Sequence, residues 1–142
     1  MKYLLDTDHI SFLQRRSGPE CAALTARMAL HPPADFALSV VSFHEQVLGA
    51  HTFLGRARTT ADAIRGYTLL QEILQGFQSA PVLPFDAAAA AVFDGLRVQR
   101  VRVATMDLRI AAITLSQGLV LLTRNTVDFG RVPGLVTEDW TV

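Results

Sequence analysis

Short apolar segments alternate with longer amphipathic ones from one end of the chain to the other, which leaves few folds open. The apolar segments predict strands over residues 2–5, 36–41, 81–85 and 119–122, with an edge strand near 135–136. The stretches between them have helical spacing. Strands that alternate with helices form a parallel sheet with helices on both faces. We therefore expect an α/β fold, a parallel-sheet sandwich with helices on both faces.

Helices are indicated by their start and stop residues as well as by their spacing. Pro19 stands near the first position of one helix, Asp86 is placed to cap another, and Gly118 follows a third as its C-terminal glycine. We expect a helix after an acidic loop at residues 6–8, and further helices over 20–30, 42–55, 60–79, 86–99 and 106–117.

Length and composition indicate one soluble domain. A chain of 142 residues has the usual size of a single domain, so we expect one domain over 1–142. Half of the residues are hydrophobic and 18% are charged, which excludes disorder. Cys21 is the only cysteine, Asp6 and Asp8 interrupt the N-terminal apolar stretch, and no apolar run approaches the roughly 18 residues of a membrane span. These features predict a cytoplasmic protein without disulfides or membrane contact.

Four acidic residues occupy equivalent places in the predicted pattern. Asp6 follows the first strand, Glu45 the turn after the second, Asp107 begins a helix, and Asp128 comes shortly after the last buried strand. Such places lie near the carboxyl edge of a parallel sheet, where these folds bind ligands. Gathered carboxylates without a histidine or cysteine cluster favour magnesium or manganese over zinc.

Each acid also has a purely structural interpretation. Ser42 and Glu45 fit the S-x-x-E capping box, and Asn125 to Asp128 fits a helix start with an acid in its first turn. Asp107 could complement a helix dipole. Asp6 is harder to explain in this way, because Thr7 or Asp8 could cap the first helix in its place. The case for a functional site therefore rests on the four acids jointly.

That joint pattern resembles the PIN-domain ribonucleases, and among them the VapC toxins of bacterial toxin-antitoxin pairs. The likeness covers nearly the whole chain, in the family's order and spacing. Its segments are Leu4–Asp8, Ser39–Glu45, Met106–Ala112 and Leu122–Phe129, and the ending from Arg131 to Trp140 is similar to enterobacterial VapC.

The resemblance implies a PIN-like parallel-sheet sandwich in one PIN domain over 1–142. It also implies the activity of a metal-dependent endoribonuclease. Asp6, Glu45, Asp107 and Asp128 would surround one or two Mg²⁺ ions, or Mn²⁺, Thr7 would assist, and Thr123 and Asn125 would line the site. A metal-activated water would cut the phosphodiester and leave a 5′-phosphate. The implied substrate is tRNA, with the initiator anticodon loop as the best choice, and the implied partners are a VapB-type antitoxin and a second copy of the chain.

Asp8 departs from the resemblance, since relatives of this type usually carry asparagine there. The extra carboxylate could tighten metal binding or cap the first helix, and the cap is the slightly favoured interpretation.

The distribution of charge and apolar residues agrees with RNA and antitoxin binding. With the four acids set aside, thirteen basic residues stand against nine acidic ones, and twelve of the basic residues are arginine. Several stand near the acids in sequence, namely Arg97, Arg100, Arg102, Arg109, Arg124 and Arg131. The helices expected over 20–30, 42–55 and 60–79 are apolar enough to form a groove for an antitoxin, unless all these residues pack inside the domain.

Two other functions remain open on the sequence. Asp6-Thr7-Asp8 also matches the D-x-D of haloacid-dehalogenase-type phosphatases, but that class needs a lysine downstream and the only lysine here is Lys2. A non-catalytic PIN-like scaffold could bind RNA or a partner without cutting, although the presence of all four acids argues against it.

Overall fold

The computed structural model describes residues 1–142 and contains one five-stranded sheet with seven α-helices. All strand pairs are parallel, and the strands lie in the order β3-β2-β1-β4-β5. The predicted α/β class is confirmed. The elements in chain order are β1 Tyr3–Leu5, α1 Thr7–Arg15, α2 Pro19–Met28, a 3-10 turn Pro33–Asp35, β2 Phe36–Ser39, α3 Val40–Gly55, α4 Thr60–Gly76, β3 Val82–Leu83, α5 Ala87–Val98, α6 Thr105–Gln117, β4 Val120–Leu122, α7 Thr126–Phe129 and β5 Thr137–Glu138.

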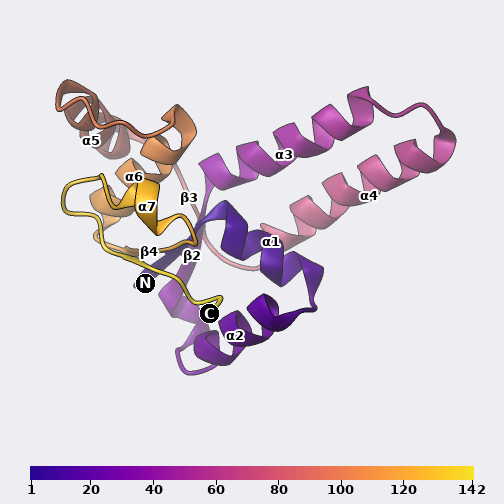
Figure 1. The fold of residues 1–142 in the computed structure, drawn as a ribbon, viewed down its shortest axis with the longest axis horizontal. Coiled ribbons are helices and arrows are strands. Elements are labelled where there is room, and N and C mark those ends of the chain that lie inside the picture. The colour runs from indigo at the N-terminus through magenta and orange to yellow at the C-terminus, as the bar shows by residue number, and fades with distance from the viewer.

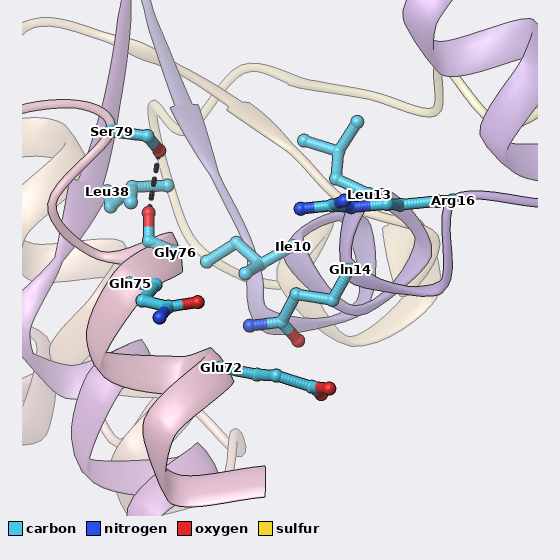
Figure 2. A pocket seen from close by; sticks show the side chains of 9 residues that line it. All are labelled: Ile10, Leu13, Gln14, Arg16, Leu38, Glu72, Gln75, Gly76 and Ser79. Carbon is cyan, nitrogen blue, oxygen red and sulfur yellow. Dashed lines mark hydrogen bonds between the residues drawn. The ribbon is translucent and has the colours of Figure 1, made fainter. Parts of the chain in front are cut away.

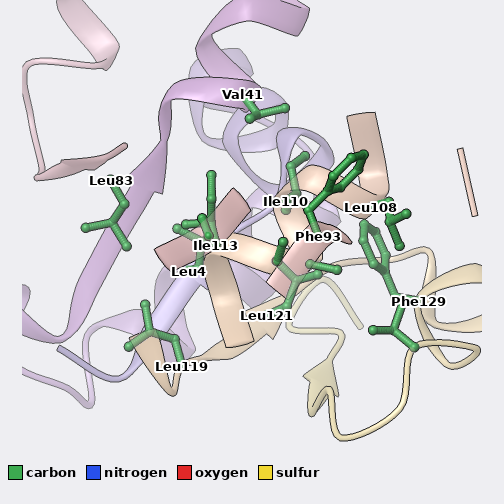
Figure 3. Packing of buried hydrophobic residues seen from close by; sticks show 14 of the residues in the cluster. Leu4, Val41, Leu83, Phe93, Leu108, Ile110, Ile113, Leu119, Leu121 and Phe129 are labelled. Atoms are coloured by element: carbon green, nitrogen blue, oxygen red, sulfur yellow. The ribbon is translucent and has the colours of Figure 1, made fainter. Parts of the chain in front are cut away.

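Two hydrophobic cores cover the two faces of the sheet. Neighbouring residues of a strand point to opposite faces, so Leu4 lies in one core and Leu5 in the other. The first core joins the sheet to α5 and α6 through residues such as Phe93 and Ile110 (Figure 3). The second core joins the sheet to α1, α2 and the long helices α3 and α4, and it includes the buried Trp140 near the C-terminus. Because both faces are covered, the three central strands are largely apolar, whereas the edge strand β5 is Thr137–Glu138.

Helices α3 and α4 form an antiparallel hairpin that extends away from the sheet (Figure 1). They contact each other along their length, and α3 begins directly at the end of β2. Several large apolar side chains of the hairpin remain exposed: Leu48, Ile64, Tyr67, Leu69 and Leu74. None of the helices has the length and the apolar run that a membrane span requires.

The three central strands end at one edge of the sheet. Leu5 pairs with Leu122 and Leu4 with Ala37, so the residues that follow β1, β2 and β4 are neighbours. The backbone N–H of Asp6 donates to Leu122 O at 2.9 Å, which continues the ladder by one residue. This alignment brings together segments that are far apart in the sequence.

Three predicted boundaries are wrong. The third helix begins at Val40 rather than Ser42, since the side chain of Ser39 is its N-cap and accepts a hydrogen bond from Ser42 N. The capping box assigned to Ser42 and Glu45 is therefore wrong as well. Residues 7 and 8 belong to the first turn of α1 and not to a loop. The edge strand is Thr137–Glu138, two residues later than expected, because Leu135 packs against the first core.

Candidate active site

Asp6 lies at the centre of the edge where the strands end. It is the N-cap of α1, where its Oδ1 accepts from Thr7 N at 2.8 Å, and its Oδ2 accepts from Thr123 Oγ1 at 2.7 Å. Only 6% of the residue is exposed. Burial and the negative charge of Asp8 raise the pKa of Asp6 to about 7, against the lowering effect of its hydrogen bonds. A nearby positive charge would therefore stabilise the ionised form of Asp6.

Glu45 faces the same edge from the second turn of α3. Its Oε1 accepts from Thr7 Oγ1 at 2.8 Å, and the same hydroxyl lies 3.0 Å from Ser42 Oγ. Glu45 does not return to the Ser42 amide, because that amide is bound by Ser39. Thr7 thus links the start of α1 to α3. The spacing in the sequence predicts Ser42 only as a helix cap and does not indicate its contact with Thr7.

Asp107 lies in the first turn of α6, after an N-cap residue, Ala104, that has no side-chain bond to the helix. Partial burial raises its pKa, and the charges of Glu45, Asp128 and Asp8 raise it further, in that order. These couplings reach acids on three other segments of the chain. They indicate that the predicted carboxylates gather at one edge and repel one another.

Asp128 lies on the short helix α7, as the sequence predicts. Asn125 is its N-cap, with Oδ1 accepting from Asp128 N at 3.3 Å and Nδ2 donating to Asp128 Oδ2 at 3.0 Å. Arg131 approaches the same carboxylate at 3.5 Å, in a pair that is about half exposed and so contributes little to stability. Asn125 therefore orients the acid, while Arg131 partly neutralises it.

Asp8 does not cap α1, and that favoured interpretation is wrong. Asp6 occupies the cap, and the Asp8 carboxylate turns to the loop after β4, where it accepts from Arg124 N at 2.9 Å. On its other side it contacts His9 Nδ1 at 2.6 Å. His9 is fully buried and was not among the residues that the sequence singled out. A lone histidine in an apolar helix carries no signal of such a contact.

The donor set suits a hard cation. The four acids, Thr7 and Thr123 all offer oxygen, and His9 is engaged on both ring nitrogens. As the side chains stand, no group of three or more Asp, Glu, His or Cys residues is close enough to hold one ion. The raised pKa values of Asp6 and Asp107 are nevertheless what a divalent cation would reverse. Magnesium and manganese prefer such oxygen ligands.

A small cationic cavity lies between α5 and the start of α6. It has a volume of about 310 Å³, and Arg97, Arg109 and Thr105 stand on its wall. Both guanidinium groups lie 5.7 Å from the centre of the Phe93 ring, one from α5 and the other from α6. Unlike Arg131, neither Arg97 nor Arg109 forms an ion pair within the chain. This wall is thus available to an anion.

A larger groove of about 550 Å³ lies between α1 and the C-terminal end of α4 (Figure 2). Ile10, Leu13 and Leu38 form its apolar part, and polar side chains such as Gln14 and Glu72 line the rest. The groove differs from the predicted one in its walls, because α1 takes part and neither α2 nor α3 lines it. The exposed apolar residues of the α3–α4 hairpin lie on the helices beside it.

Comparison with known proteins identifies relatives that match this chain over nearly its full length. The chain is 32% identical to the tRNA(fMet)-specific endonuclease VapC of Shigella flexneri and 30% identical to that of Salmonella typhimurium, with 98–99% of each protein covered. No family model matches the chain. Among solved structures, it superimposes on a chain of the DNA-bound VapBC complex from Salmonella typhimurium with a TM-score of 0.75 and 26% identity, over 99% of this chain and 98% of that one.

Proposed function

This chain belongs to the VapC endonuclease family, and on that premise we propose that it is the toxin of a VapBC pair, a metal-dependent endoribonuclease that cuts tRNA. The curated relatives are tRNA(fMet)-specific, so the initiator tRNA, cut in its anticodon loop, is the proposed substrate. We propose that residues 1–142 act as one PIN domain in the cytoplasm, where tRNA is found, and that two copies form a dimer.

The observation that carries the proposal is the mutual repulsion of acids from separate segments at one sheet edge. Asp107 is coupled to Glu45 and Asp128, and Asp6 is buried at the same edge with its pKa raised to about 7. A purely structural set of helix caps would not need to bring these charges together. Perturbed carboxylates that converge in this way are typical of functional sites.

In the proposed site Asp6, Glu45, Asp107 and Asp128 hold one or two Mg²⁺ ions. The metal, when bound, polarises the phosphodiester and lowers the pKa of a water that attacks phosphorus. The chain's own residues orient the acids. Thr7 donates to Glu45, Thr123 donates to Asp6, and Asn125 donates to Asp128. Three of the four proposed ligands are thereby held by a neutral hydroxyl or amide that leaves their charge intact, and Asp107 has no such partner.

The cationic cavity supports RNA as the substrate. Arginine recognises phosphate through paired N–H donors, and Arg97 and Arg109 line this cavity without carboxylate partners. RNA whose scissile phosphate reached the acids would place its neighbouring phosphates near this wall. The phosphatase alternative has no such support, because Lys2 remains the only lysine and Asp8 is bound by the Arg124 amide and His9.

The groove between α1 and α4 supports a VapB-type antitoxin as partner. Ile10, Leu13 and Leu38 form its apolar part, and the α3–α4 hairpin, whose second helix forms one wall, exposes Tyr67 at 65% and Ile64 at 63%. Exposed apolar side chains around a groove are typical of a surface that accepts an amphipathic helix from a partner. A basic side chain on the antitoxin would find counter-charges in the acids at the sheet edge.

A cleavage assay with initiator tRNA tests the enzymatic proposal. We expect cleavage that requires Mg²⁺ or Mn²⁺, stops with a chelator, and leaves 5′-phosphate ends. Products with 2′,3′-cyclic phosphate ends, or cleavage at full rate in the presence of the chelator, would contradict it. Tight RNA binding without cleavage under all metal conditions would support the non-catalytic scaffold instead.

Magnesium should stabilise the protein more at pH 8 than at pH 5.5. The folded-state pKa of Asp6 is raised from 3.8 to about 7, so the folded protein binds more protons than the unfolded one between these values. Stability of the metal-free protein therefore falls as the pH rises through this window, by at most about 4 kcal/mol for Asp6. Metal binding at high pH restores it. Thermal melting with and without Mg²⁺ at both pH values measures the difference, and an equal shift at both would contradict the assignment.

Glu45→Gln should remove activity without harming the fold. Glutamine keeps an oxygen that can accept from Thr7 Oγ1, so the free energy of unfolding should change by no more than about 1 kcal/mol. The loss of the charge should lower the cleavage rate at least about tenfold. Glu20→Gln in the first turn of α2 is the matched control and should cleave at the wild-type rate. A large fall in melting temperature with activity retained would make Glu45 a structural residue.

A further inference from the structure

Both carboxylate oxygens of Asp8 are bound by other parts of the chain. Oδ1 accepts from His9 Nδ1 at 2.6 Å, and Oδ2 accepts from the Arg124 backbone N–H at 2.9 Å. Thr123 Oγ1 lies 3.3 Å from the same Oδ2. Asp8 therefore connects the first turn of α1 to the loop between β4 and α7, which is more than a hundred residues away in the sequence.

His9 extends this connection to the C-terminal segment. It is fully buried, and its Nε2 accepts from the backbone N–H of Trp140 at 3.2 Å. A backbone N–H can only donate, so Nε2 must present its lone pair and the ring hydrogen must lie on Nδ1, which faces Asp8. One tautomer thus satisfies both contacts. Trp140 is itself buried, with its ring 4.7 Å from that of Tyr3 and 5.2 Å from that of His31.

The contacts of Asp8 and His9 lead to the active site through the Thr123 hydroxyl, which precedes Arg124 in the β4–α7 loop. It has one hydrogen, and its distance of 2.7 Å to Asp6 Oδ2, against 3.3 Å to Asp8, assigns that hydrogen to Asp6. The oxygen also accepts from Asn125 N at 3.0 Å. The position of this loop, which the Arg124 amide ties to Asp8, therefore decides how Asp6 is oriented.

We propose that Asp8 and His9 are a positioning pair that anchors the β4–α7 loop to the C-terminal segment Asp139–Thr141 and so holds the Thr123 hydroxyl on Asp6. The proposal rests on the proposed RNA cleavage for its effect on rate. Neither residue of the pair needs to touch the substrate, since both act through Thr123. The C-terminal residues, which carry no ligand, thereby take part in the geometry of the site.

The two members of the pair are matched to each other. An asparagine at position 8 has one acceptor oxygen and one N–H₂ group, whereas Asp8 accepts from two N–H donors, one on each oxygen. With asparagine, one of these N–H donors would face another donor. This chain therefore needs the carboxylate because it has a histidine at position 9.

Steady-state cleavage of tRNA with Mg²⁺, well below each variant's melting temperature, tests the pair. His9→Leu removes both hydrogen bonds and should lower kcat at least about tenfold with KM within about twofold. His9→Asn keeps a donor toward Asp8 and should recover most of that loss. Asp8→Asn should resemble His9→Leu, and the double variant should be no worse than Asp8→Asn alone, because residues that act as a unit are not additive.

Leu24→Ala is the matched control for destabilisation. Leu24 is fully buried in the same core as Trp140 and makes no hydrogen bond to the site through its side chain. It should lower the melting temperature and leave kcat unchanged. A kcat for His9→Leu equal to that of Leu24→Ala would overturn the proposal. So would a double variant whose loss of kcat is the product of the losses in Asp8→Asn and His9→Leu.

Amide hydrogen exchange separates this proposal from the proposed function. In the protein without RNA or metal, exchange of the Arg124 amide should be at least about tenfold faster in Asp8→Asn and His9→Leu than in the wild type. Unchanged exchange in both variants would overturn the positioning pair even if tRNA is cut. Faster exchange in both variants, together with a wild-type protein that fails to cut RNA, would retain the pair and refute only the enzymatic function.

Discussion

Replacing Asp6 by asparagine is expected to abolish RNA cleavage while leaving the fold intact. The amide is a poorer ligand for a hard cation than the carboxylate, so the rate should fall by more than about a hundredfold, the upper effect of residues that only support a ligand. The asparagine oxygen can still accept from Thr123 Oγ1 or from Thr7 N. Cleavage of initiator tRNA at saturating Mg²⁺ measures the loss.

The same substitution should change the pH dependence of stability in a defined direction. In the wild type, the raised pKa of Asp6 makes the metal-free fold less stable as the pH rises from about 4 to 7. Asp6→Asn has no carboxyl group to titrate at position 6. Its melting temperature should therefore vary less with pH and should equal or exceed that of the wild type at pH 8. Near wild-type cleavage by the purified variant would refute the assignment of Asp6 to the metal site.

Expression of the protein alone is expected to arrest bacterial growth. A nuclease that cuts the initiator tRNA stops translation, so a cell can tolerate it only when a partner blocks the site. Coexpression with the reading frame adjacent to and upstream of its gene should restore growth and yield a complex that copurifies. Growth curves after induction and affinity purification through a tag on one partner give both readouts.

Asp6→Asn is the control for this second experiment. It should be harmless on expression and should still bind the antitoxin, because the apolar groove between α1 and α4 does not include Asp6. Substituting Leu13 in the groove by aspartate should weaken the complex. Normal growth during strong expression of intact, soluble wild-type protein would contradict the toxin assignment even if weak cleavage persisted in vitro.

The alternation of apolar strands and amphipathic helices was sufficient to predict the α/β class. In a parallel sheet the strands end at a common edge, so Asp6 and Asp128 could be assigned to one site without knowing the order of the strands. Asp86, Asn125 and Gly118 were recognised as helix ends because capping depends on residues a few positions away. These features are local or follow from the period of the pattern.

The start of α3 could not be placed by the same reasoning. Ser39 and Ser42 are both good N-caps, and Glu45 completes a capping box with the second. In the structure Ser39 is fully buried and binds the Ser42 amide, while Thr7 binds the Glu45 carboxylate from another helix. The hydrogen bond from Thr7 to Glu45, across 38 residues, therefore holds the Glu45 carboxylate at the sheet edge and away from the Ser42 amide.

The sequence alone was enough to propose which acids form the site, since their places depend on strand ends and helix starts that short-range patterns reveal. The tertiary structure alone decided what Asp8 and His9 do, because their partners Arg124 and Trp140 lie more than a hundred residues away. A hydrogen bond depends on distance and direction in space, and no spacing along the chain encodes these for residues brought together only by the packing of the sheet.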